Sequence, residues 1–72
     1  MRTFTKGRDR GQWWPYQLRS ARGAIIRCPK CSQERPVWDG HLDPSGVSIR
    51  PIPCVAGDCH WREHIRLEGW RR

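Results

Sequence analysis

The four cysteines of this 72-residue chain form two close pairs, and their spacing is its strongest chemical feature. Two residues separate Cys28 from Cys31, four separate Cys54 from Cys59, and 22 residues lie between the pairs. A tight turn within each pair would aim two sulfur atoms at one point, which suits a metal that takes four ligands in a tetrahedron. We therefore expect these four thiolates to hold one Zn²⁺ ion.

Four thiolates would fill the coordination sphere of zinc and leave no position for a substrate water. This donor set indicates a structural site. Two alternatives stay open: a histidine, with His60 nearest to the pairs, replaces one cysteine, or iron occupies the thiolates, alone or in a cluster. The chain shows no nucleophile motif and is too short for a sizeable pocket, so we expect neither enzymatic activity nor a small-molecule substrate.

The short chain itself favours a metal. Only 36% of its residues are hydrophobic, and so small a domain buries too little apolar surface to fold comfortably without a metal, disulfide or partner. We see no apolar leader at the N-terminus and no stretch that could span a bilayer. We therefore expect a cytoplasmic protein without membrane contact, where paired cysteines favour a metal over disulfides.

Short strands must position the cysteines. We expect them over three segments that carry β-branched or alternating apolar residues: 24–27, 36–39 and 47–52. Residues 60–68 alternate in polarity, which favours a strand with Trp61, Ile65 and Leu67 on one face. A helix is the alternative, because Trp61 and Ile65 also lie one helical turn apart.

These elements predict a small, metal-bound, mostly β fold. Its class would be a zinc ribbon of about three short antiparallel strands with two zinc knuckles and a basic N-terminal arm. We assign the arm to residues 1–23, the ribbon domain to 24–68 and a short tail to 69–72. The arm holds few apolar positions, so we expect it to be coil or only partly ordered.

The positive charge lies mostly before the first cysteine. The formal net charge is +7, and residues 1–27 hold seven basic residues against one acidic residue, a net of 7 − 1 = +6. Twelve of the 14 basic residues are arginines, whose planar fork suits phosphate. An anionic partner, above all nucleic acid, is favoured over a merely solubilising role.

Aromatic residues interleave with these arginines. Bases stack on aromatic rings while phosphates meet arginine, so this mixture suits a single-stranded nucleic acid. Our candidate nucleic-acid-binding residues are Arg8, Arg10, Trp13, Trp14, Tyr16, Arg19, Arg22, Arg62 and Arg66. Trp13 and Trp14 could equally complete the small core. Trp38 and Trp61 favour the core, whereas Trp70 fits either a surface contact or a partner anchor.

The spacing C-x2-C-x22-C-x4-C resembles that of the Ogr/Delta family of phage late-transcription activators. The match covers Cys28 to Cys59 and the following segment from Trp61 to Leu67. The resemblance implies zinc binding, contact with promoter DNA and contact with RNA polymerase in the host cytoplasm. The chain is also similar to the C-terminal zinc ribbons of bacterial type IA topoisomerases, which present aromatic residues to single-stranded DNA.

We therefore expect a zinc-binding, nucleic-acid-associated regulator of transcription, phage-encoded and in contact with RNA polymerase, with DNA favoured over RNA. The alternative is a protein–protein interaction module or inhibitor that docks on a host enzyme without binding nucleic acid. Salt dependence separates the two, because binding to nucleic acid releases counterions and weakens steeply as salt rises.

Overall fold

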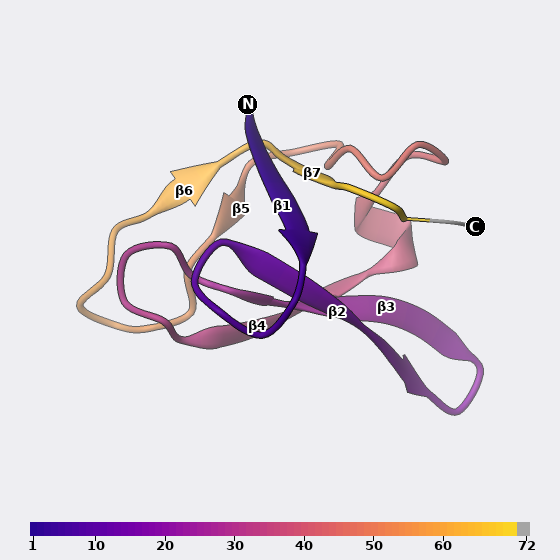
Figure 1. The fold of residues 1–72 in the computed structure, drawn as a ribbon, viewed down its shortest axis with the longest axis horizontal. Helices are drawn as coiled ribbons and strands as arrows, with labels where there is room; N and C mark the ends of the chain where they lie inside the picture. The colour runs from indigo at the N-terminus through magenta and orange to yellow at the C-terminus, as the bar shows by residue number, and fades with distance from the viewer. Residues whose placement is uncertain (71–72) are drawn as a thin grey trace.

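The computed structural model describes residues 1–70 (Figure 1), so the Arg71–Arg72 part of the tail predicted over 69–72 lies outside the described residues. The elements, in chain order, are β1 (Arg2–Lys6), β2 (Gln12–Leu18), β3 (Ala21–Arg27), β4 (Glu34–Trp38), the 3-10 turn η1 (Asp39–His41), β5 (Ile52–Pro53), β6 (Arg62–Glu63) and β7 (Ile65–Leu67). Within residues 1–70, no helix has the length and apolar character needed to cross a membrane.

Five strands form the main sheet, in the order β4-β3-β2-β1-β7, and β5 pairs with β6 in a second, two-stranded sheet. A small, mostly β fold with clustered cysteines is therefore confirmed. The strand arrangement differs from the three antiparallel strands that we expected. β1 runs parallel to both of its neighbours, β2 and β7, and its pairing with β7 places the first and last strands side by side (Figure 1).

The expectation of a coil over residues 1–23 is wrong. β1 and β2 lie in the sheet, and β2 forms an antiparallel hairpin with β3 that crosses the predicted boundary at residue 23. Phe4 and Trp13 are the apolar anchors of these strands, at 0% and 2% exposure. Phe4 stands among polar neighbours in sequence and Trp13 stands beside a second tryptophan, so only partners distant in the chain reveal that each is buried.

The ribbon segment follows the sequence more closely. Strand β3 contains the whole predicted segment 24–27, and β4 contains the predicted segment 36–39 except Asp39. Both strands begin earlier than predicted. The predicted strand over 47–52 is wrong, because only Ile52 falls in β5, and Val47 and Ser48 make isolated bridges. Pro51 supplies no N–H for a ladder there.

Residues 60–68 are extended, as expected, rather than helical. The segment is divided into β6 and β7 at His64, and Trp61, Ile65 and Leu67 are all buried. The side chains of Arg62 and the other polar residues between them are half-buried or exposed. The strand interpretation and its buried face are therefore confirmed.

One face of the main sheet packs into the core. Trp61 meets Phe4 edge to face with ring centroids 5.9 Å apart, and Trp70 packs on Trp13 at the same separation. Trp61 and Trp70 are 5% and 7% exposed, so both belong to the core. Aromatic contacts of this kind add to the free energy gained from burial alone.

The opposite face, here called the outer face, carries a second set of aromatic residues. Strand alternation and register place Trp14, Tyr16, Gly23 and Trp38 on it. The Tyr16 and Trp38 rings lie 5.7 Å apart, on either side of Gly23. Tyr16 and the neighbouring Leu18 are 39% and 51% exposed, so this part of the outer face is open to solvent.

Replacing Gly46 by alanine is expected to destabilise the fold by at least about 2 kcal/mol. Gly46 has φ +89°, and an added Cβ would lie 2.7 Å from the Trp70 Cβ and 3.0 Å from the Leu67 carbonyl oxygen. Urea unfolding of the metal-loaded protein would measure the loss. Gly40→Ala is the matched control, since nothing lies within 4 Å of its added Cβ, and a similar loss in both variants would contradict this account.

Candidate metal centre and nucleic-acid interface

The four cysteine sulfurs converge on one point. All four lie within 4.8 Å of one another, with Cys28 Sγ 3.7 Å from Cys59 Sγ and Cys31 Sγ 3.4 Å from Cys54 Sγ. These separations are too long for a disulfide bond, and all four cysteines are free. A tetrahedron of thiolates around Zn²⁺ would place its sulfurs about 3.8 Å apart. The predicted ligand set is therefore assembled, and it can hold a metal ion.

Two turns bring the pairs together. Cys28 directly follows strand β3, and the turn that it begins closes with a hydrogen bond from the Ser32 amide to the Cys28 carbonyl. The Lys30 amide points at the Cys28 sulfur, 3.4 Å away. In the second turn, the amide of Cys54 donates to the carbonyl of Trp61 across the β5–β6 pair. Backbone hydrogen bonds thus shape both turns, and the four sulfurs that the turns carry come together.

The thiols differ in acidity. Burial acts to raise the pKa of Cys28, but hydrogen bonds from the backbone amides of Cys31 and Lys30 outweigh it and lower the pKa to about 7. Burial raises the pKa of Cys54 to about 12, with the adjacent Cys31 thiol adding to the effect. The pKa of Cys59 is also raised: the Trp61 amide acts to lower it, but burial and the neighbouring thiols prevail.

These acidities make metal binding depend on pH. Cys54 and Cys59 carry protons at neutral pH and must lose them to become ligands, so acid competes with the metal. If two protons are released, the apparent affinity for Zn²⁺ should fall by about 100-fold for each unit of decrease in pH near neutrality. Competition with a chromophoric chelator at two pH values measures this change. An affinity that does not vary with pH would contradict thiolate ligation.

One arginine lies beside the cluster. Burial lowers the pKa of Arg35, and the nearby Cys54 thiol opposes that effect electrostatically. Its Nε atom is buried and has no hydrogen-bond partner within residues 1–70. A metal with four thiolates carries a net charge of about −2, which Arg35 would help to balance. No histidine joins the cysteine group in the described part of the chain.

Arginines surround Trp14 on the outer face. The guanidinium carbon of Arg8 lies 4.6 Å from the centroid of the Trp14 ring, and that of Arg27 lies 5.6 Å away. Arg27 is held there by the Arg8 carbonyl, the Ser32 carbonyl and the Glu34 carboxylate. Arg27 thus already donates from Nε, Nη1 and Nη2 to protein acceptors. Within residues 1–70 the Arg8 guanidinium makes no hydrogen bond or ion pair, so the cation–π contact fixes it over the ring while leaving its edge able to meet an anion.

Several other predicted residues join or flank this surface. Arg10 hydrogen-bonds to the Ser32 hydroxyl, and the two line a cleft together with Arg8 and Arg27. Arg66 shares the outer face by its register with Thr3 in β1. Arg19 occupies the β2–β3 turn at a φ of 55°.

The remaining candidates lie elsewhere. Trp13 is buried in the core, which is the alternative that the sequence left open, so its ring offers no stacking surface. Arg22 stacks on Trp70 with its guanidinium carbon 4.6 Å from the ring centroid, and Arg62 belongs to the second sheet. Sequence reasoning missed Arg27 and Trp38 as members of the outer face. The alternation of Arg27 with the buried Ile26 was the available signal for the first, whereas strand register alone places the second.

Comparison with protein-family models, curated proteins and solved structures returns no match. The support for a metal site at the cysteine cluster is therefore the geometry of the cluster. It does not by itself establish the Ogr/Delta family, and contact with RNA polymerase stays a prediction of that resemblance.

Proposed function

We propose that this chain is a zinc-binding domain that binds single-stranded nucleic acid across the outer face of its main sheet. The observation that carries the proposal is the group of aromatic rings on that face, half-buried or exposed, with arginine guanidinium groups fixed beside them. Large apolar groups exposed on a folded surface commonly mark an interaction site. Their arginine neighbours favour an anionic partner.

Zinc is the metal that we assign to the cysteine cluster. Four sulfur donors at tetrahedral separations suit zinc, and no ligand position is left open for a substrate. The role of the ion is to hold the β3–β4 turn and the β5–β6 turn together. It acts on nucleic acid only indirectly, by fixing the sheet that presents the outer face.

We propose a single-stranded partner because the outer face presents aromatic rings on which unpaired bases can stack. Unpaired bases expose their flat faces and can stack on Trp14, Tyr16 or an arginine plane, whereas the bases of a duplex already stack on each other. Arg8, Arg10 and Arg27 line one cleft together with Asp9 and Ser32. There the Arg8 guanidinium beside Trp14 would meet a phosphate of such a strand. DNA remains favoured over RNA only by the family resemblance.

Nuclear magnetic resonance of the tryptophan indole N–H groups tests this proposal. Adding a single-stranded oligonucleotide to the zinc-loaded protein should shift the signals of Trp14 and Trp38, which lie on the outer face. The signal of Trp61, buried beside Phe4, should change little and serves as the internal control. If Trp14 and Trp38 do not respond at saturating oligonucleotide, the outer face is not the binding surface.

Control of transcription would extend this proposal. Its support is the cysteine spacing, and the basic charge of the chain is compatible with it. A pull-down of RNA polymerase with the zinc-loaded protein, with and without nuclease treatment, would separate direct docking on the enzyme from tethering through nucleic acid.

A further inference from the structure

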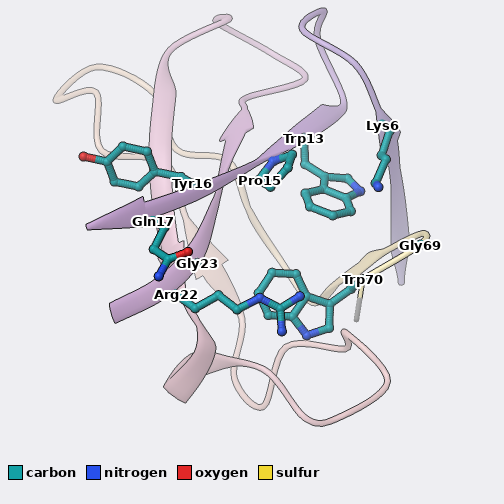
Figure 2. Close-up of a pocket in the computed structure, with 9 residues that line it drawn as sticks. All are labelled: Lys6, Trp13, Pro15, Tyr16, Gln17, Arg22, Gly23, Gly69 and Trp70. Carbon is teal, nitrogen blue, oxygen red and sulfur yellow. The ribbon is translucent and has the colours of Figure 1, made fainter. Parts of the chain in front are cut away.

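A second surface lies on the other side of the β2–β3 hairpin. Here the hairpin and the end of the chain border a cleft of about 380 Å³, within the size range of small-ligand sites. Figure 2 shows Lys6 beside Trp13, and Arg22 running over Trp70, while Tyr16 points away from them. The lining residues are Lys6, Trp13, Pro15, Tyr16, Gln17, Arg22, Gly23, Gly69 and Trp70.

Two cations in this cleft are held by aromatic rings. The Lys6 Nζ atom lies 5.4 Å from the centroid of the Trp13 ring, and the Arg22 guanidinium lies over Trp70. Neither cation forms an ion pair with any residue of the described chain, in which Arg2–Glu63 and Arg27–Glu34 are the ion pairs. The rings themselves are 2% and 7% exposed, so they fix the cations and offer little stacking surface of their own.

Two fixed cations without a carboxylate partner favour an anion with several oxygen atoms, and arginine in particular favours phosphate. The cleft has more room than a bare phosphate needs. Pro15 and the indole edges give it apolar walls, and the Gln17 amide can both donate and accept hydrogen bonds. Phosphate joined to a sugar and a planar base matches this combination of walls.

The position of the cleft relates it to the outer face. Tyr16 and Gly23 line the cleft and also belong to the hairpin surface that carries the Tyr16–Trp38 ring pair. A strand lying over those rings would reach the cleft by passing around the hairpin. We propose that the cleft binds a nucleotide phosphate of the strand held on the outer face, an inference that rests on the proposed function.

The test compares three small probes and one strand on the zinc-loaded protein. Thymidine 5′-monophosphate should shift the indole signals of Trp70 and Trp13, whereas thymidine and inorganic phosphate should bind at least about tenfold more weakly. Arg22→Gln and Lys6→Gln should each weaken the nucleotide by about tenfold. Arg50→Gln, remote from the cleft, should leave its affinity unchanged. An unshifted Trp61 signal would show that each variant is folded.

Several results would overturn the inference. One is equal binding of thymidine and its monophosphate, another is equal binding of phosphate and the nucleotide, and a third is full affinity in Arg22→Gln. A single-stranded oligonucleotide separates the two proposals. If the oligonucleotide shifts the signals of Trp14 and Trp38 but not that of Trp70, the cleft does not bind the strand, and the proposed function is unaffected. If the Trp70 signal shifts with the mononucleotide and no tryptophan signal shifts with the oligonucleotide, the proposed function is wrong. The phosphate bound in the cleft would then not come from a nucleic-acid strand.

Discussion

Removal of the metal is expected to abolish the native fold of this chain. Structural zinc contributes about 10–16 kcal/mol in small domains, which matches or exceeds the total stability of about 5–15 kcal/mol typical of a folded domain. The ion would join the turn after β3 to the turn after β5, and the second sheet contains only two residues in each of its strands. Without that link, β5 and β6 have too few contacts to hold Trp61 over Phe4.

The near-ultraviolet circular dichroism of the tryptophans measures this loss, because a fixed aromatic core is its source. A strong chelator should eliminate the signal, and added Zn²⁺ should restore it. Cys28→Ser should have the same effect as the chelator, since Cys28 is a proposed ligand and, at 2% exposure, also a core residue. Asp58→Asn, an exposed change within the second turn, is the matched control. A signal that survives chelation would show that the ion is not structural.

Replacement of Trp14 by alanine is expected to cause the largest loss of nucleic-acid affinity of any single change on the outer face. Stacking of one base on an aromatic ring contributes about 1–3 kcal/mol, which corresponds to a weakening of roughly 5- to 150-fold. Trp14 also fixes the guanidinium group of Arg8, so its loss removes the contact that holds one phosphate-binding group in place.

Leu18→Ala is the matched control for this variant. Leu18 lies on the same strand and the same face as Trp14 and is 51% exposed, but it offers no ring for stacking. Fluorescence anisotropy of a labelled single strand would measure both affinities, with unfolding by urea as a check on stability. Equal losses in the two variants, or none in Trp14→Ala, would contradict a stacking role.

The convergence of the four cysteines could be predicted from the sequence because the pattern that encodes it is local. Each close cysteine pair nearly defines its own turn, and tetrahedral ligation then dictates that the two turns meet. The buried face of residues 60–68 could also be predicted, since Trp61, Ile65 and Leu67 alternate with polar residues as a half-buried strand requires.

The N-terminal strands could not be predicted in the same way. Phe4 stands among polar residues, and Trp13 begins the aromatic run Trp13-Trp14-Pro15-Tyr16. The burial of each depends on a partner 57 positions along the chain, Trp61 for Phe4 and Trp70 for Trp13. The parallel pairing of β1 with β7 likewise joins segments more than 60 positions apart. Such long-range contacts leave no pattern in the local sequence, so the local sequence predicts a polar arm for this segment.

The division of the aromatic residues between the two faces of the sheet could not be predicted either, because it also depends on strand pairing. Trp13 and Trp14 are adjacent and chemically equal, and only the period of two along β2 sends one into the core and the other to the outer face. The register of β3 with β4 then adds Trp38 beside Tyr16. Composition predicts a basic, aromatic surface, and the sheet decides which residues form it.

The most direct test of the central claim is the affinity of the zinc-loaded protein for a single strand of about 12 nucleotides, compared with a duplex of the same sequence, as salt rises from about 50 to about 200 mM. We predict that the single strand binds at least about tenfold more tightly than the duplex and loses roughly 20- to 100-fold in affinity over that range, as expected for three to five or so neutralised phosphates. The absence of single-strand binding at the lower salt, or equal affinity for the duplex, would contradict the account.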